Sequence, residues 1–315
     1  MEAGGKKIII ESEEMTAVMS QAEKVVDNDF TVLLFGESGV GKGVVARYIH
    51  ERSTRAMGRF IVVNCGAIPE TLIEAELFGY ERGAFTNAFS AHKGYFEQAN
   101  NGTILLDEIS ELPLIMQVKL LNILESKYVV RIGSEKEIPI NARVIAATNR
   151  DLQPLVREGK FRLDLYYRLA VYPISIPPLR RRKDDIKALA FHFLRKNNGN
   201  GKILSDEALR KLHAYDWPGN VRELESCMVR TILASDGKEL ISAEDIQLEG
   251  IQWEGHEAER RALEEALTKA GGSIKHTSRL LGVHRNTVYN KVKKLSINLV
   301  GFRNSNLISR NGAKL

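Results

Sequence analysis

The sequence predicts an α/β protein: a doubly wound, mostly parallel sheet, followed by a small all-helical region and a basic helical module. Three observations support this. Short β-rich apolar runs alternate with helical patterns in the first two-thirds of the chain, and the pattern becomes helical after Pro177-Pro178. Residues 271–295 hold six Lys or Arg and no Asp or Glu. The 315 residues, 43% of them hydrophobic, are enough for two or three domains.

Five runs are expected to form the sheet, because each is largely apolar, as in parallel strands buried on both faces. They are Thr31–Phe35, Ile61–Asn64, Thr103–Leu106, Arg143–Ala147 and Tyr172–Ile176. Lys42–Arg52 and Pro113–Glu125 are helix candidates between them. Val129–Arg131 and Glu137–Ile140, around Gly133-Ser134, predict a β-hairpin inserted before the fourth strand.

The region after the double proline shows helical patterns at Ile186–Arg195, Ser205–His213 and Val221–Ala234, with Ser205 as an expected N-cap. Another helix is expected over Glu257–Ala270. The predicted division is an α/β subdomain over residues 1–178, a helical lid over 179–245, a linker over 246–256, a basic module over 257–296 and a loose tail over 297–315.

Several classes of protein are excluded by composition. No apolar run is long enough to cross a bilayer, so no membrane role is expected, and MEAGGKKIII is too short for a secretory signal. Cys65 and Cys227 lack ligand-like spacing, which predicts two reduced packing residues of a cytoplasmic protein. A formal net charge of +5 permits a polyanionic partner without requiring one.

A glycine-rich loop follows the first strand and opens a helix, which is the context of a phosphate-binding P-loop. It comprises Gly36, Glu37, Ser38, Gly39, Val40, Gly41, Lys42 and Gly43. We expect backbone N–H groups to cradle phosphates and Lys42 to reach the β/γ oxygens. Gly43 replaces the usual Ser or Thr that binds Mg²⁺, so water or other ligands must substitute. The alternative is a glycine-rich turn with no ligand.

Two carboxylates end the third strand. Asp107 at the strand tip is expected to hold the Mg²⁺ shell, and Glu108 to polarise the attacking water. The alternative is a pair of acidic residues that cap the next helix. Together with the P-loop, the pair indicates hydrolysis of ATP with Mg²⁺ rather than nucleotide binding alone.

Six motifs, in order, resemble the sigma-54-dependent activators, the bacterial enhancer-binding branch of the AAA+ ATPases. They are GESGVGKG (36–43), ELFGYERGAFTNA (76–88), GTILLDEI (102–109), ATNRDL (147–152), FRLDLYYRL (161–169) and WPGNVREL (217–224). The resemblance covers roughly residues 9–296. It implies an AAA+ α/β subdomain, a helical lid and an ATPase activity.

The resemblance also implies roles for single residues. Asn149 matches sensor I, which feels the γ-phosphate, and Asn64 matches the switch residue that holds the catalytic glutamate. Arg222 matches the sensor II arginine. Arg162 and Arg168 match two arginine fingers that act on the ATP of a neighbouring subunit, so activity should need a ring, usually a hexamer in this family. Taken alone, such arginines could equally serve in surface salt bridges.

One loop resembles the family's GAFTGA loop, which grips the sigma factor. It comprises Gly83, Ala84, Phe85, Thr86, Asn87 and Ala88, with Phe85 as the expected contact and Thr86 as its support. Asn87 stands at the family's second glycine. Asparagine tolerates left-handed conformations, so the loop's shape could survive, but its bulk could impair engagement.

The basic segment resembles a Fis-type helix-turn-helix, with a first helix over Ser273–Leu281, a turn at Gly282 and a recognition helix over roughly His284–Lys294. Val288, Val292 and Leu295 recur at helical spacing and should face inward. The expected DNA-facing residues are Arg285, Asn286, Thr287, Tyr289, Asn290, Lys291, Lys293 and Lys294. A solvated basic helix is the alternative, and His276-Thr277 replaces the family's small alanines.

These patterns together predict a cytoplasmic activator that binds upstream double-stranded DNA as a dimer or larger assembly. It would form an ATPase ring and remodel sigma-54 RNA polymerase. Almost nothing precedes the P-loop domain, so a regulatory protein acting in trans, or a trimmed chain, is expected. One rival is a nucleotide-sensing DNA-binding regulator that does not remodel sigma-54, because of Asn87. A second rival is an AAA+ motor that acts on DNA itself.

Overall fold

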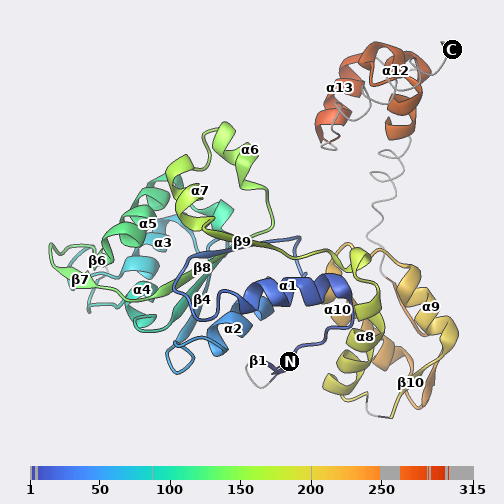
Figure 1. Ribbon diagram of the computed structural model, residues 1–315, viewed down its shortest axis with the longest axis horizontal. Helices are drawn as coiled ribbons and strands as arrows, with labels where there is room; N and C mark the ends of the chain where they lie inside the picture. Colours follow the sequence, from blue (N-terminus) through green and yellow to red (C-terminus); the bar gives the residue numbers. More distant parts are fainter. Residues whose placement is uncertain are drawn as a thin grey trace. The chain divides into compact units, whose positions relative to one another are not determined.

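The computed structural model describes residues 2–3, 6–86, 88–199, 201–248, 263–281, 283, 285–294 and 297. By its internal contacts the chain divides into two compact units, Met1–Gln247 and Leu248–Leu315 (Figure 1). The first unit holds the sheet and the helical lid, and the second holds the basic helices. We describe each unit by itself.

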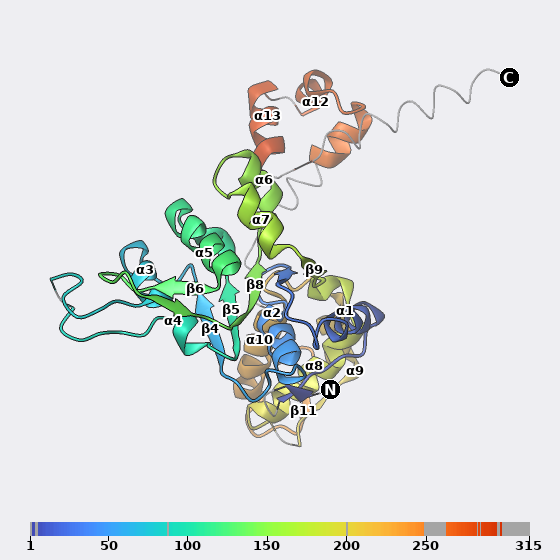
Figure 2. The same ribbon diagram turned by 60° about the vertical axis from the view of Figure 1, so that its left-hand side comes forward.

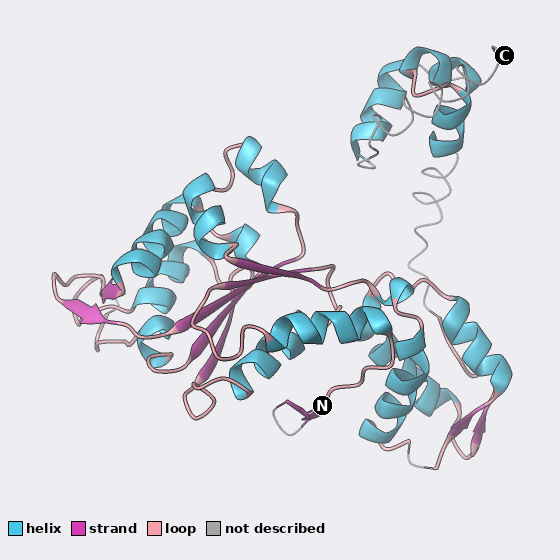
Figure 3. Cartoon of the chain, in the orientation of Figure 1, coloured by secondary structure: helices cyan, strands magenta, loops and turns pink. Residues whose placement is uncertain are grey.

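A five-stranded parallel sheet forms the centre of the first unit, in the order β4-β5-β8-β3-β9 (Figure 3). Its strands are β3 (Val32–Phe35), β4 (Phe60–Asn64), β5 (Thr103–Asp107), β8 (Arg143–Thr148) and β9 (Tyr172–Ser175). The five expected strands are therefore confirmed, with ends that shift by about one residue. In the strand register Asn64 pairs with Asp107, and Phe35 pairs with Thr148, so four strand ends meet at one edge.

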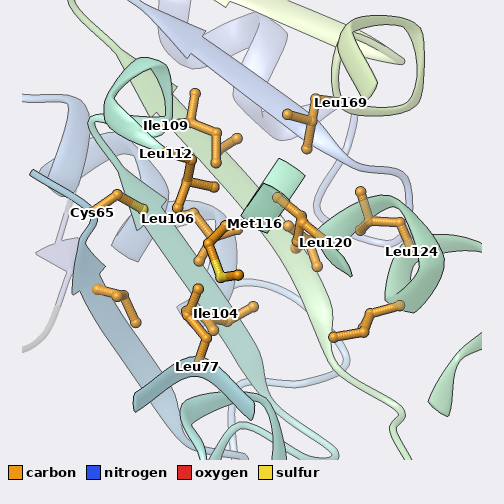
Figure 4. Packing of buried hydrophobic residues seen from close by; sticks show 14 of the residues in the cluster. Cys65, Leu77, Ile104, Leu106, Ile109, Leu112, Met116, Leu120, Leu124 and Leu169 are labelled. Atoms are coloured by element: carbon orange, nitrogen blue, oxygen red, sulfur yellow. The ribbon is translucent and has the colours of Figure 1, made fainter. Parts of the chain in front are cut away.

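The pleat of the sheet divides its apolar side chains between two cores. Ile104 and Leu106 face one core, whereas Leu105 between them faces the other. Figure 4 shows the first core, where Leu106 and Ile104 meet Met116 and Leu120. The helices over this face are α3 (Glu70–Phe78), α4 (Tyr95–Gln98), α5 (Leu114–Ser126), α6 (Leu152–Arg157) and α7 (Leu163–Leu169). The helices over the opposite face are α1 (Glu13–Glu23) and α2 (Lys42–Glu51).

The expected hairpin is present between α5 and β8. Its strands, β6 (Tyr128–Val130) and β7 (Glu137–Pro139), pair antiparallel. This part of the unit also contains the antiparallel pair β1 (Glu2–Ala3) and β2 (Lys6–Lys7), and the 3-10 helix η1 (Ile109–Glu111). The sequence patterns had not singled out α1, α3, α4, α6 or α7.

The lid is a helical bundle with one small pair of parallel strands (Figure 2). Its elements are η2 (Leu179–Arg181), α8 (Asp184–Lys196), β10 (Ile203–Leu204), α9 (Asp206–Ala214), α10 (Asn220–Ala234) and β11 (Leu240–Ile241). Ser205 accepts the Ala208 N–H at 3.2 Å, which confirms it as the N-cap of α9. Trp217 is fully buried in front of α10 and donates from Nε1 to the Leu212 carbonyl at 2.8 Å.

The second unit contains helical residues 263–269, α12 (Ile274–Leu280) and α13 (Arg285–Lys294). Its core consists of Leu263, Leu267, Val288, Val292 and Ile297. The inward positions of Val288 and Val292 are thus confirmed. Gly282, His284, Leu295, most of the expected linker and nearly all of the expected tail lie outside the described residues.

Two negative findings concern the described ranges only. None of their helices is both long enough and apolar enough to traverse a lipid bilayer. Cys65 and Cys227 are both buried and unpaired, as expected for packing residues. Burial raises the pKa of the Cys65 thiol to about 12, so this side chain stays protonated.

Candidate nucleotide-binding site

The glycine-rich loop connects β3 to α2 at the edge where the strand ends meet. Gly36 donates its N–H to the Thr148 carbonyl of β8 at 3.3 Å, which fixes the start of the loop. Gly39 and Gly41 have φ angles of 77° and 105°, which glycine adopts readily and other residues rarely. Gly41 immediately precedes α2, so the loop ends at a helix N-terminus.

Every backbone carbonyl from Gly36 to Gly41 accepts a hydrogen bond. Lys42 Nζ donates to the first two carbonyls, at 2.8 and 3.1 Å, and the first turn of α2 donates to the last. The three between are held by the lid, through Asn220 Nδ2 to Ser38, Val221 N–H to Gly39 and Arg182 Nη2 to Val40. With its carbonyls fixed in this way, the loop can turn N–H groups toward an anion at the α2 N-terminus.

Lys42 lies at the centre of this loop with its ammonium group largely enclosed. Burial lowers its pKa, while the carboxylates of Asp107 and Glu108 oppose that shift. The same two carboxylates were expected to act on the nucleotide. The structure brings them close enough to Lys42 for their charges to raise its pKa. A lysine ammonium group that loses hydrating water at this position is stabilised most by charge-assisted hydrogen bonds to a polyanion.

Asp107 and Glu108 occupy the end of β5. Asp107 Oδ1 accepts the Glu108 N–H at 3.0 Å, and Glu108 takes a left-handed conformation with φ of 55°. A Cβ added at Gly66 would lie 2.6 Å from Glu108 Oε2 and 3.5 Å from Asn64 Oδ1, so both side chains flank this glycine. Asn64 Oδ1 itself accepts the N–H groups of Gly66 and Ala67.

Asn149 follows the last residue of β8 and is exposed at the same strand edge. Its neighbour Thr148 shapes the turn, since Thr148 Oγ1 accepts the Arg150 N–H at 3.0 Å. The Thr148 carbonyl is also the one that accepts the Gly36 N–H. The expected sensor position therefore adjoins the start of the phosphate loop.

The lid contacts the loop through more residues than the sequence indicated. Arg222, the expected lid arginine, donates from Nη1 to Ser38 Oγ at 3.1 Å. Arg180 forms a two-point pair with Glu37, at 2.6 and 2.8 Å, and holds the pKa of that carboxyl low. Asn220, inside the recognised WPGN motif, donates to Ser38. The sequence signal that could have identified Asn220 was a polar residue in a turn between buried residues.

Gly43 lies at the second position of α2, where a Mg²⁺-binding hydroxyl would commonly stand. A Cβ placed there meets no heavy atom within 4 Å. Within the described residues, His, Cys, Asp and Glu side chains form no group of three that could hold a metal. The donors present, Asp107 with Glu108 nearby, suit Mg²⁺, which commonly takes one or two carboxylates together with substrate phosphates.

The two arginines expected to act on a neighbouring subunit lie on α7 and just before it. Arg162 pairs with Asp164 at 2.6 and 3.0 Å, and both side chains are about half exposed. Arg168 is exposed and donates from Nη2 to the Leu124 carbonyl at the end of α5. In this chain the two side chains thus contact α5 and α7 residues rather than the phosphate loop.

The GAFTNA segment is a turn closed by its own backbone. Gly83 donates to the Ala88 carbonyl at 2.8 Å, and Ala88 donates to the Phe85 carbonyl at 2.9 Å. The ring of Phe85 lies 4.8 Å from that of Tyr80 and is 42% exposed. Thr86 is exposed, while Asn87 lies outside the described residues. The aromatic expected to make contact is therefore accessible.

The basic helix α13 presents Arg285, Thr287 and Tyr289 as exposed side chains, and Lys291 as half-buried. The side chains of Asn286, Asn290, Lys293 and Lys294 lie outside the described set. In α12, Thr277 is fully buried and donates from Oγ1 to the Ser273 carbonyl at 2.9 Å. This bond satisfies the hydroxyl at a position where the family often has alanine.

Comparison with known proteins matches three segments of the chain to known families. Residues 8–175 match the sigma-54 interaction domain family, residues 180–263 match the AAA+ ATPase lid domain, and residues 256–295 match the bacterial regulatory protein, Fis family. The chain belongs to the sigma-54-dependent transcriptional activators. It accordingly combines an AAA+ ATPase domain with a Fis-type DNA-binding domain.

Several relatives of this activator are known by name. It is 45% identical over 291 residues to the Sigma54-dependent transcriptional activator SfnR of Pseudomonas putida, covering 90% of this chain and 78% of that protein. Regulatory protein AtoC of Escherichia coli (strain K12) is 41% identical over 313 residues, covering 92% and 68%. A signal-transduction and transcriptional-control protein of Clostridium beijerinckii is 43% identical over 307 residues, but the chain spans only 48% of its length.

Solved structures that resemble this chain include complexes with nucleotides. The crystal structure of NtrX from Brucella abortus in complex with ATP has a TM-score of 0.71 and 30% identity to this activator. The match covers 92% of this chain and 69% of that one. A second structure of NtrX holds ADP, with a TM-score of 0.70 over the same shares.

Proposed function

We propose that this chain hydrolyses ATP with Mg²⁺ in a ring of identical subunits and uses the energy to remodel sigma-54 RNA polymerase. The observation that carries the proposal is a phosphate loop whose backbone carbonyls all accept hydrogen bonds, beside the Asp107-Glu108 pair. The work would take place in the cytoplasm, where bacterial DNA and RNA polymerase are located.

In the proposed mechanism, backbone N–H groups of the loop and Lys42 bind the phosphates. Asp107 would hold Mg²⁺, and the metal would supply positive charge against the charge that develops on the phosphates. Glu108 accepts a proton from the attacking water, and Asn149 orients that water from the next strand end. Arg222 closes over the nucleotide from the lid, as its bond to Ser38 places it beside the loop.

We assign Arg162 and Arg168 to the ATP of the neighbouring subunit. Within one chain both side chains contact α5 or α7, and both are exposed. An arginine donated across a subunit boundary stabilises transition-state charge and makes hydrolysis depend on assembly. This supports a ring, which we propose to be a hexamer. Asn64, beside Glu108 at Gly66, would hold the glutamate until a partner engages.

We propose that the Fis-type module binds double-stranded DNA upstream of the promoter as a dimer. Arg285 at the start of α13 has the chemistry to recognise guanine, and the lysines suit phosphates. Deleting residues 257–315 should abolish binding to the promoter site and leave ATP hydrolysis intact. Regulation by another protein in trans remains part of this proposal.

The decisive test is open-complex formation at a sigma-54 promoter with purified polymerase and ATP. Activation by the chain, and its loss with Phe85→Ala at unchanged ATPase activity, would support remodelling. The rival regulator, which senses nucleotide without remodelling, predicts DNA binding and ATP hydrolysis with no open complex. If Asn87 is the cause of such a failure, Asn87→Gly should restore activation.

A further inference from the structure

A buried ion pair in the lid lies between the phosphate loop and the start of α1. Asp185 in α8 is fully buried, and Arg182 just before this helix is 4% exposed. Arg182 Nη1 and Asp185 Oδ2 are 3.7 Å apart. Burying two charges is unfavourable unless each also finds hydrogen-bond partners, so the partners show what the pair holds in place.

Arg182 connects the pair to the nucleotide site. Its Nη2 donates to the Val40 carbonyl at 2.6 Å, and its Nη1 lies 3.3 Å from Met15 Sδ in α1. Because a trans peptide is planar, the direction of the Val40 carbonyl also fixes the direction of the Gly41 N–H. In the proposed ATP site, that N–H belongs to the turn that would face the phosphates.

Asp185 connects the ion pair to the segment directly before α1. Its Oδ1 accepts the backbone N–H groups of Glu11 at 2.7 Å and Ser12 at 2.8 Å. Its Oδ2 accepts the Ser12 hydroxyl at 3.1 Å. Ser12 is also the N-cap of α1, since its hydroxyl oxygen accepts the Met15 N–H at 3.2 Å. Three donors therefore fix the carboxylate against the segment that leads into α1.

We propose that Arg182 is a positioning residue for the nucleotide site and that Glu11 and Ser12 hold it in place through Asp185. A displacement of the chain at residues 11–12 would then turn the Val40–Gly41 peptide and weaken phosphate binding. This proposal rests on the proposed ATP site and adds a means of regulating it. Any segment or partner that pulls on Ser12 changes the affinity for ATP.

The test compares Arg182→Met with Arg181→Met in the full chain. Arg181 is the exposed neighbour of Arg182 and serves as the matched control. For Arg182→Met, the KM for MgATP and the Kd for ATP should both rise about tenfold, as expected when one charged hydrogen bond is lost. The kcat at saturating ATP should change much less, because Asp107 at the end of β5 and Glu108 just after it belong to a different segment from the phosphate loop. Arg181→Met should leave both constants unchanged.

A second pair of variants tests the connection to the entering segment. Ser12→Ala removes one hydroxyl and should raise KM by about threefold, whereas Ser12→Thr keeps the hydroxyl and should restore the wild-type value. Asp185→Asn added to Arg182→Met should cause little further change in KM, because the two residues act as one unit. The double variant also avoids leaving a single buried charge, and so protects the fold.

A purely structural role predicts a lower melting temperature with unchanged KM and Kd in every folded variant, and that result would overturn the proposal. If Arg182→Met does not fold, the Ser12→Ala and Ser12→Thr pair decides the question. A wild-type chain that binds ATP without releasing phosphate would instead refute the proposed hydrolysis. The Kd comparison would still test the positioning role.

Discussion

Asn220 Nδ2 in the lid donates to the Ser38 carbonyl of the phosphate loop at 3.0 Å, while Asn220 Oδ1 accepts the Leu179 N–H at 2.8 Å. The residue is fully buried and has a φ of 55°. Asparagine tolerates this left-handed conformation better than most residues, so both its side chain and its backbone suit the position. One amide therefore connects the lid, the η2 turn and the loop.

Replacing Asn220 should destabilise the protein in two separable ways. Asn220→Ala loses the amide contacts, and alanine tolerates a left-handed conformation less well than asparagine, so the free energy of unfolding should fall by about 2–4 kcal/mol. Asn220→Gly loses the same contacts without that strain and should be about 1 kcal/mol more stable than the alanine variant. Urea denaturation measures both. Equal stabilities would show that the conformation contributes nothing.

Glu108→Gln should bind ATP but hydrolyse it slowly, because glutamine cannot accept a proton from water. We expect kcat to fall by about 10²–10⁴ while the Kd for ATP stays close to the wild-type value. Phosphate release and equilibrium nucleotide binding measure the two quantities. Glu125→Gln, an exposed acid on α5, is the control. Unchanged turnover in Glu108→Gln would remove this residue from the mechanism.

Arg168→Ala should abolish hydrolysis, with a fall in kcat of about 10³-fold or more. The affinity for nucleotide should not fall. Mixing provides a stricter test. Rings assembled from Arg168→Ala and Glu108→Gln chains contain some interfaces with both wild-type residues, so the mixture should regain part of the activity that each variant lacks. If the mixture stays inactive although mixed rings assemble, Arg168 does not act across the subunit boundary.

Gly43→Thr should be tolerated and should lower the Mg²⁺ concentration needed for half-maximal hydrolysis. The added Cβ meets no heavy atom within 4 Å, and threonine supplies the hydroxyl that commonly binds the metal in this motif. Gly41→Ala is the matched comparison, since its Cβ also meets nothing but its φ is 105°. That variant should lose nucleotide affinity through backbone strain. An unchanged Mg²⁺ requirement in Gly43→Thr would contradict metal binding at this position.

His50 should make stability depend on pH. Burial lowers its pKa, and its Nδ1 lies 3.0 Å from Thr103 Oγ1. Near pH 6.5 and below, His50 binds a proton more readily in the unfolded chain than in the folded chain. The free energy of unfolding therefore falls as the pH drops through about 6.5. His50→Gln should therefore lose less stability than wild type between pH 7.5 and 5.5 in urea titrations.

Local patterns were sufficient for the sheet and for the chemistry at its edge. A strand buried on both faces must be apolar along its whole length, which made Thr103–Asp107 recognisable and placed Asp107 at its end. The glycines at 39 and 41 were also readable, because only glycine takes those φ angles without strain. Short helices such as α6 and α7 were not, since helices of six or seven residues depend on tertiary contacts. For α1 the signal existed in Ser12 followed by Glu13 and Glu14.

The sequence by itself therefore determined the strands, the phosphate loop, the carboxylate pair and the resemblance to a family of activators. Only the tertiary structure decided which lid residues hold the loop. Arg182 and Asn220 lie 142 and 182 residues from the loop carbonyls that they contact. Contacts over such separations leave no periodic signal, because they depend on how the lid packs against the sheet rather than on any local preference of the chain.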